Sequence, residues 1–444
     1  MSSLVSTSYS RVALYSAILA AAFCLALPAQ GQTFSVIHNF TGGADGANPY
    51  AGLTLDRAGN LYGTTMAGGY TGSGCNSGCG TAFKLSQKNG HWMFDPLHIF
   101  SGPGNNDGAY PLARIVFGPD GALYGTTSSG GSRANGGQAA GTVFRMTPPR
   151  SVCRAVVCPW IETVLYPFAG PPDGSAPGYG DVAFDAAGNI YGTTINGGSD
   201  NYLCNDGTCG TVYELAHSGG GWAESLLYQF IQGSIPGYWP YPGVIFDSAG
   251  NLYGATTWNF GTVFELTPGS DGGWTPNTLY VFENYSQDGG APAGGLIFDQ
   301  AGNLYGTTSG DGPNNGGTVF ELVHSGGQWN LNTLYAFTYT GNPGFNPPGP
   351  TSTLVMDANG NLYGTTLLDG AFNQGSVFKL THAGGSWVLT TLHDFTGGSD
   401  GANPWGQLVL DANGDIYGTA TAGGSTVGSC SGGLGCGVVF EITP

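Results

Sequence analysis

The strongest constraint on this chain is a segment that recurs seven times along it. The copy at residues 299–322 reads D-Q-A-G-N-L-Y-G-T-T, then a Gly-rich insert, then G-G-T-V-F-E-L. A Tyr-Gly pair marks the centre of every copy, and successive pairs are 52–67 residues apart. The seven tyrosines are Tyr62, Tyr124, Tyr191, Tyr253, Tyr305, Tyr363 and Tyr417. A repeat of this period predicts one supersecondary unit per copy, and the units stack on one another.

Each copy contains four short apolar segments and no helical spacing. Between residues 292 and 337 they are P-A-G-G-L-I-F-D, G-N-L-Y-G-T-T, G-T-V-F-E-L and W-N-L-N-T-L-Y-A-F. Runs rich in Val, Leu, Phe, Tyr and Thr, separated by Gly, Asn and Asp, are typical of β-strands. The short D-x-x-G-N connection, as at Gly302-Asn303, predicts a tight hairpin. Seven units of four antiparallel strands predict an all-β fold, a seven-bladed β-propeller.

The two ends of the chain share the seventh unit. Its third strand is expected at residues 437–443, and no fourth strand follows. Residues 33–40, T-F-S-V-I-H-N-F, match the fourth-strand segments L-H-I-F at 97–100 and L-H-D-F at 392–395. We expect this N-terminal strand to complete the last blade, close the ring and cover a strand edge that is otherwise open to pairing.

Residues 1–31 have the pattern of a cleaved export signal. Arg11 is their only charge, residues 12–27 are apolar, and Ala29-Gln30-Gly31 offers a cleavage site between small residues. A membrane anchor is the alternative, but the apolar run is short for a span of about 20 residues. We therefore predict a signal peptide at 1–31 and a single propeller domain at 32–444. The processed protein is expected to be secreted or extracytoplasmic, without a membrane span.

The charge balance excludes some classes of partner. The chain has 10 Lys and Arg against 28 Asp and Glu, a formal net charge of −18. Nucleic acid and anionic membranes bind basic surfaces, so neither is expected as a partner. Solubility of an exported protein explains the acidic balance more simply than a specific cationic partner. The expected partners are an unknown polysaccharide or an extracellular protein, and the protein is expected to be a monomer.

Eight cysteines follow residue 31 and form four local pairs. Short spacing in an exported chain predicts disulfides that pin loops. A thiolate metal site is the alternative, but each pair supplies only two of the four ligands that such a site needs. The predicted disulfides are Cys75–Cys79, Cys153–Cys158, Cys204–Cys209 and Cys430–Cys436.

The repeated unit carries a family resemblance. D-x-x-G-N-L-Y-G-T-T-x-x-G-G, followed by G-T-V-F-E-L-T, resembles the tandem repeat of the bacterial choice-of-anchor GloVer-type proteins. It is more loosely similar to the NHL-type propeller repeat, P-x-G-I-x-x-D-x-x-G-N-I-Y. The resemblance covers the chain after residue 31 and implies export and a propeller-like array, without a known activity. Unlike the family pattern, the chain stops at Pro444 directly after the last predicted strand, so surface anchoring is not expected.

Two functions from different classes stay open. One is a non-catalytic exported binding or interaction propeller, whose ligand is a carbohydrate or a surface protein. The other is an extracellular polysaccharide-active enzyme, a lyase or hydrolase, on the same ring. Such an enzyme needs acid and base groups converging in one pocket, whereas the repeated carboxylates are spread evenly round the ring. Motifs for common hydrolases and nucleotide-binding proteins are also missing, so no catalytic residue is assigned and binding is favoured.

The connections that lead from one unit to the next carry the candidate site residues. Six of the seven contain an aromatic residue, suited to stacking on sugar rings, and half-buried packing is the alternative role. The candidate ligand-binding residues are Tyr50, Tyr110, Tyr179, Trp239, Phe345 and Trp405.

Five of these connections also contain an Asp-Gly step, which is first of all a turn signal. Calcium needs six to eight oxygen ligands, so a calcium site at these carboxylates is the less favoured reading. No other cofactor is expected. The five residues are Asp45, Asp107, Asp173, Asp288 and Asp400.

Overall fold

In the computed structural model, the Asp of the D-x-x-G-N segment holds a hairpin turn together. Asp299 Oδ1 accepts hydrogen bonds from the main-chain N–H groups of Ala301 and Asn303, at 2.8 and 2.9 Å. Asp299 Oδ2 accepts from Asn303 Nδ2 at 2.8 Å and from the Tyr305 hydroxyl at 3.2 Å. Gly302 has a φ of 85°, which this turn requires and which costs glycine little. The motif therefore fixes the hairpin and ties its Tyr to the same carboxylate.

The structure describes residues 32–72, 74–102, 105–131, 140–149, 159–198, 209–230, 237–258, 260–283, 287–339, 349–424, 430 and 433–444. Their strands form seven four-stranded antiparallel sheets and two short two-stranded sheets. The described residues contain no α-helix, and hence no helix long and apolar enough to cross a membrane. The all-β prediction is confirmed.

We number the four-stranded sheets as blades 1 to 7 and give their strands in pairing order. Blade 1 contains β2 (Thr54–Leu55), β3 (Leu61–Thr65), β4 (Thr81–Lys88) and β5 (His91–Ile99). Blade 2 contains β7 (Val116–Phe117), β8 (Leu123–Thr127), β10 (Thr142–Thr147) and β11 (Ile161–Pro167). Blade 3 contains β13 (Ala183–Phe184), β14 (Ile190–Thr194), β16 (Thr211–Ser218) and β17 (Gly221–Gln229).

The remaining blades follow the same order. Blade 4 contains β18 (Val244–Phe246), β19 (Leu252–Thr256), β20 (Thr262–Pro268) and β21 (Trp274–Val281). Blade 5 contains β22 (Ile297–Phe298), β23 (Leu304–Thr308), β24 (Asn315–Ser325) and β25 (Gln328–Thr338). Blade 6 contains β26 (Val355–Met356), β27 (Leu362–Thr366), β28 (Ser376–Ala383) and β29 (Ser386–Asp394). Blade 7 contains β30 (Val409–Leu410), β31 (Ile416–Ala420), β32 (Val438–Thr443) and β1 (Thr33–Asn39).

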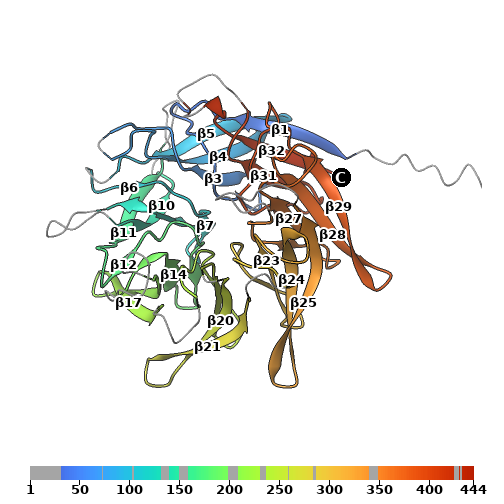
Figure 1. Ribbon diagram of the computed structural model, residues 1–444. Coiled ribbons are helices and arrows are strands. Elements are labelled where there is room, and N and C mark those ends of the chain that lie inside the picture. Colours follow the sequence, from blue (N-terminus) through green and yellow to red (C-terminus); the bar gives the residue numbers. More distant parts are fainter. Residues whose placement is uncertain are drawn as a thin grey trace, which may run out of the picture.

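Two small sheets extend the connections of blades 2 and 3. Strand β6 (Gly108–Ala109) pairs with β9 (Ser129–Gly130), and β12 (Gly174–Ser175) pairs with β15 (Asn196–Gly197). The blades are arranged in a ring (Figure 1). The chain is therefore a seven-bladed β-propeller, as the repeat predicts.

The N-terminal strand closes the ring. Strand β1 pairs antiparallel with β32, with Phe34 opposite Ile442 and Asn39 opposite Val438. The Phe40 N–H then donates to the Gly437 carbonyl at 3.1 Å. Both ends of the chain therefore contribute to blade 7, and Figure 1 shows β1 beside β32.

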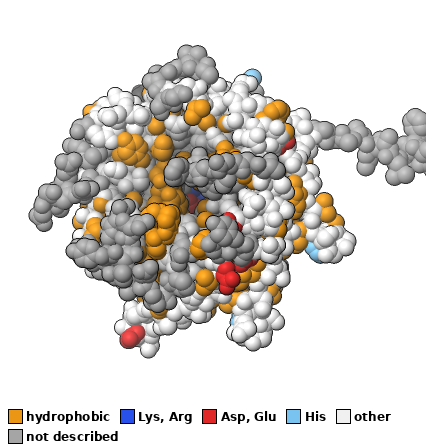
Figure 2. Space-filling model, in the orientation of Figure 1, with side chains coloured by type: hydrophobic (Ala, Val, Ile, Leu, Met, Phe, Trp, Pro, Cys, Tyr) orange, Lys and Arg blue, Asp and Glu red, His pale blue; other side chains and the backbone are white. Residues whose placement is uncertain are grey.

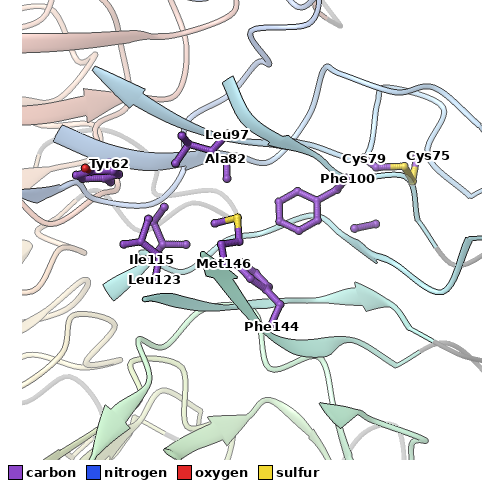
Figure 3. Packing of buried hydrophobic residues seen from close by; sticks show 11 residues of the cluster. Tyr62, Cys75, Cys79, Ala82, Leu97, Phe100, Ile115, Leu123, Phe144 and Met146 are labelled. Carbon is purple, nitrogen blue, oxygen red and sulfur yellow. A yellow bond between two sulfur atoms is a disulfide. The ribbon is translucent and has the colours of Figure 1, made fainter. Parts of the chain in front are cut away.

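The core lies between neighbouring blades. Each of the seven clusters of buried apolar residues combines side chains from two consecutive blades, including one cluster between blades 7 and 1. Between blades 1 and 2, Phe100 packs edge-on against Phe144 at a ring-centroid distance of 5.2 Å. Figure 3 shows Phe100 lying between the Cys75–Cys79 disulfide and Met146. A blade therefore buries both of its faces only when both neighbouring blades are present.

The structure confirms part of the predicted disulfide pattern. Cys75–Cys79 and Cys430–Cys436 are disulfides, and Cys209 is also disulfide-bonded. The other predicted cysteines, Cys153, Cys158 and Cys204, lie outside the described residues.

Candidate functional site

A cavity lies where the seven blades meet. Its lining comes from the segments that lead into the first strand of each blade, such as Tyr50–Gly52 before β2 and Trp405–Gln407 before β30. Because seven blades contribute, the cavity lies on the axis of the ring, and we call it the axial cavity. Its volume is about 90 Å³. Figure 2 shows charged side chains inside a hollow near the centre of the ring, with hydrophobic side chains beside it.

Four aromatic rings form one continuous wall of the axial cavity. Tyr50 stacks on Trp405 with ring centroids 4.8 Å apart. Tyr50 also meets the edge of Tyr179 at 6.0 Å, and Tyr179 packs on Tyr241 at 4.3 Å. The four residues come from blades 1, 3, 4 and 7, so the wall exists only in the closed ring.

Two tyrosines of this wall, Tyr50 and Tyr241, have raised pKa values. Burial, and then the neighbouring Tyr179 and Tyr241 phenols, raise the pKa of Tyr50 well above its ordinary value. Burial and Tyr179 likewise raise the pKa of Tyr241. The wall therefore offers flat apolar faces together with neutral hydroxyl groups at physiological pH.

One ion pair lies in the axial cavity. Arg114 Nε and Nη2 donate to Asp181 Oδ2 at 2.9 and 2.7 Å, and the Arg114 main-chain N–H donates to Asp181 Oδ1 at 3.1 Å. Both side chains are partly buried, with exposed fractions of 24% and 32%. They are the only charged residues among the described lining, so the cavity is electrically neutral overall.

Hydroxyl groups line the cavity at blade 6. Ser352 Oγ accepts from the Thr365 N–H at 3.0 Å, and Thr353 Oγ1 accepts from the Gly295 N–H at 2.7 Å. Thr351 differs, because its Oγ1 is buried without a hydrogen-bond partner and the residue is only 5% exposed. A buried hydroxyl without a partner is costly, and this one is set back from the surface of the cavity.

The predicted aromatics form two groups, which differ in whether the residue follows or precedes a proline of its connection. Tyr50 and Trp405 directly follow Pro49 and Pro404, and with Tyr179 they line the cavity. Tyr110 and Trp239 instead precede a proline, have φ of 59° and 62°, and are not among the lining residues. Phe345 lies outside the described residues.

Tyr110 and Trp239 have other contacts. The Tyr110 hydroxyl donates to the Gly74 carbonyl at 2.8 Å, and Trp239 packs on Trp258 at a ring-centroid distance of 4.7 Å. The aromatic that sequence reasoning missed in the blade 4 connection is Tyr241. It follows Pro240 as Tyr50 follows Pro49, and alignment of the connections on their prolines identifies it.

Four of the five predicted metal-site aspartates accept hydrogen bonds from main-chain N–H groups at the start of the loops that contain them. Asp45 and Asp400 accept from the main-chain N–H groups of Thr41 and Thr396, each at 2.9 Å. Asp107 accepts from the Ser101 N–H at 2.8 Å. Asp173 accepts from the Ala169 N–H in the same way, whereas Asp288 accepts from the Tyr280 hydroxyl on β21. Among the described residues, Asp107 alone of the five belongs to a group of three candidate metal ligands.

A half-buried carboxyl in blade 3, outside the cavity, is expected to make the stability of the fold depend on pH. Glu224 on β17 lies near Asp173, Tyr166 and Tyr213, and its Oε1 is buried without a hydrogen-bond partner. Burial, and then the Asp173 charge, raise the pKa of Glu224 from 4.5 to about 7. The folded protein therefore binds this proton more tightly than the unfolded chain, and the contribution to stability falls as the pH rises from 4.5 through 7.

The substitution Glu224→Gln is expected to increase the free energy of unfolding at pH 8 by about 1 kcal/mol, allowing for solvent screening of a half-exposed group. At pH 5 the two proteins are expected to be nearly equal in stability, because Glu224 is then protonated in the folded state. Urea unfolding of both proteins at several pH values between 5 and 8 measures the difference. The same shift at every pH would contradict a titrating Glu224.

One family matches nearly the whole chain. The Gloeobacter/Verrucomicrobia repeat matches four overlapping stretches, residues 23–202, 73–296, 136–351 and 258–444. No curated protein matches the chain.

Solved structures resemble the chain at low identity. A protein of unknown function from Dyadobacter fermentans is 10% identical, with a TM-score of 0.44 over 93% of this chain and 98% of that one. An ulvan lyase, a polysaccharide lyase, is 12% identical, with a TM-score of 0.45 over 81% and 86%. A luciferin-regenerating enzyme is 12% identical, with a TM-score of 0.39 over 93% and 96%. Similarity at this level says nothing about activity or ligand.

Proposed function

The chain belongs to the Gloeobacter/Verrucomicrobia repeat family, and from its axial cavity we propose that it is an exported, non-catalytic binding propeller for a neutral carbohydrate. The observation that carries the proposal is the four-ring aromatic wall, in a cavity that Thr351, Ser352 and Thr353 also line. Flat aromatic faces stack on the apolar faces of sugar rings, and hydroxyl groups bond to their edges.

The size of the axial cavity supports binding of one part of a saccharide. Pockets that enclose a whole small-molecule ligand measure about 300–1,000 Å³, whereas this cavity measures about 90 Å³. The cavity is therefore suited to one edge or one chain end of a sugar, and the rest of the ligand extends over the face of the ring. This geometry favours recognition of chain ends.

The charged groups of the cavity support binding rather than catalysis. Glycoside hydrolysis uses two carboxyl groups on either side of the scissile bond. The described lining supplies one carboxylate, Asp181, and Arg114 holds it in an ion pair. A neutral cavity also favours an uncharged ligand, because burial of an unpaired charge is costly.

Export is part of the same proposal. Disulfides persist in oxidising compartments, and the Cys75–Cys79 and Cys430–Cys436 bonds support an extracytoplasmic location. The predicted signal peptide, residues 1–31, lies outside the described residues.

The substitution Trp405→Ala is expected to weaken carbohydrate binding about tenfold, because loss of one stacking ring costs about 1–1.5 kcal/mol. Trp405→Phe keeps an aromatic face and is expected to retain most of the affinity. The measurement is a screen of the purified protein on an array of neutral polysaccharides, followed by calorimetric titration with an oligosaccharide of the best one.

Trp239→Ala is the matched control, since Trp239 belongs to the same kind of connection but does not line the cavity. It is expected to bind like the unmodified protein. Unchanged binding by Trp405→Ala together with weakened binding by Trp239→Ala would place the ligand elsewhere. Depolymerisation of any polysaccharide in the screen would show an enzyme instead.

A further inference from the structure

The outer strands of neighbouring blades meet through a repeated three-residue arrangement. The last strand of a blade carries a His or Tyr beside the Asp of the following loop, and a side chain from the outer strand of the next blade faces this pair. Between blades 1 and 2 the three residues are His98, Asp107 and Glu162. Each offers a metal-ligating atom, and the three atoms lie within 4.8 Å of one another.

The three side chains are well placed to share one ion. His98 Nε2 lies 3.1 Å from Asp107 Oδ2, a separation that two ligands of one metal ion also adopt. The Asp107 side chain is 10% exposed and that of His98 is 19% exposed. The ligand atoms therefore lie in a largely closed space between β5, the loop after it and β11.

Glu162 has no partner for one of its oxygens in this space. Its Oε1 is buried and accepts no hydrogen bond. A carboxylate oxygen of Glu162 also lies within 4.8 Å of one of Asp107. A carboxyl group that faces another carboxylate without a donor is unfavourable, and a cation between them would remove the repulsion.

We propose that His98, Asp107 and Glu162 bind one zinc ion that joins blade 1 to blade 2. One imidazole nitrogen and two carboxylate oxygens are a ligand set that Zn²⁺ accepts, with water in the fourth position. Calcium is a poorer fit because it takes six to eight oxygens, and magnesium prefers oxygen and keeps several waters. On binding, the ion replaces the hydrogen bond between His98 and Asp107 and gives Glu162 its missing partner.

The residues at the equivalent positions of other interfaces differ from those between blades 1 and 2. The pair His38 and Asp45 is faced by Phe94, whose ring stacks on the imidazole at 4.4 Å. His393 and Asp400 are faced in the same way by Phe34, at 3.6 Å. Between blades 2 and 3 the facing residue is Glu224, but Tyr166 replaces the histidine. Among the described residues, only the interface of blades 1 and 2 combines imidazole with both carboxyl groups.

Calorimetric titration of the full chain with ZnCl₂, after dialysis against a chelator, tests the proposal. We expect one zinc ion per chain and a melting temperature several degrees higher with zinc, because a ligand that binds the folded state stabilises it. The variants His98→Tyr and Glu162→Leu introduce the residues that other blades carry there, Tyr166 and Leu331, so both are expected to fold. Each is expected to bind zinc at least about tenfold more weakly, the scale of loss when even a supporting group of a metal site is removed.

The matched controls are Glu224→Leu and His393→Tyr, which make the same exchanges at interfaces that lack one ligand. Both are expected to keep one zinc ion per chain and the zinc-dependent rise in melting temperature. Zinc binding that survives in His98→Tyr and Glu162→Leu would place the ion at another group and overturn the proposal. Failure of the unmodified protein to bind zinc would overturn it as well.

Discussion

Deletion of residues 33–40 is expected to leave a protein that aggregates or melts far below the intact chain. The deletion removes β1, which pairs with β32 along its length, and the fully buried Phe40. Complete burial of one Phe side chain is worth about 1.5–3 kcal/mol, and the deletion removes several partly buried side chains besides. Whole domains are stable by only about 5–15 kcal/mol, so this loss is a large share of the total.

The deletion also exposes a strand edge. Without β1, the unpaired N–H and C=O groups of β32 face solvent and can pair with another chain. Thermal unfolding and light scattering, each compared with a chain that starts at Gln32, measure both effects. A synthetic peptide of residues 33–40, added in trans, is expected to restore part of the stability. If the shortened chain melts like the longer one, β1 does not hold the ring closed.

The substitution Gly306→Ala is expected to lower the free energy of unfolding by about 1–3 kcal/mol, as overpacking of a core does. Gly306 lies in the middle of β23 directly opposite Phe320 on β24, and the Phe320 ring covers it. A Cβ atom at Gly306 would come within 2.5 Å of Phe320 Cζ and 3.1 Å of a Leu296 methyl group. Phe320 is fully buried, so it cannot move away freely. Urea unfolding measures the change.

A double substitution tests the cause of this loss. Phe320→Leu removes the ring edge that the new methyl group would strike, so Gly306→Ala is expected to cost less in the Phe320→Leu background. Contacting residues couple by about 0.5–3 kcal/mol in such cycles. Additive effects of the two changes would mean that backbone flexibility, rather than the aromatic ring, explains why Gly306→Ala is destabilising.

The fold was predictable because one motif was repeated with its turn chemistry intact. The D-x-x-G-N segment specified the hairpin, and Asp299 performs the role that its position in the motif suggests. The resemblance of residues 33–40 to other fourth strands was enough to predict how the ring closes. These inferences depend on local spacing, which a sequence displays directly.

The axial cavity was only partly predictable. The sequence drew attention to Trp239, whereas the cavity residue of that connection is Tyr241. The difference depends on backbone conformation, because Trp239 has a positive φ before its proline and composition does not reveal this. The Arg114 and Asp181 pair was not predictable, since it joins residues 67 positions apart in different blades.

The group His98, Asp107 and Glu162 shows the same limit. Asp107 was recognised as a candidate ligand by its Asp-Gly step, but His98 was noticed only as part of the fourth-strand segment L-H-I-F. Glu162 occupies a position that is apolar in most blades. Whether it can act as a ligand depends on which side chains the neighbouring blade places beside it. The spacing of residues along the chain predicts the structure within one blade. These sites are formed by residues of two neighbouring blades, which spacing alone does not bring together.

The pairing of β1 with β32 also sets the order in which the protein can fold. Thr33 and Thr443 are 410 positions apart, yet their side chains meet. Blades 1 to 6 are each built from one continuous stretch, so their hairpins can form while the rest of the chain is still being synthesised. Blade 7 can be completed only at the end of synthesis, because its outer strand β1 is among the first segments made and the partner strand β32 is among the last. Contacts of such long range are slow to form, and a chain that stops early leaves β1 without the strand that it pairs with.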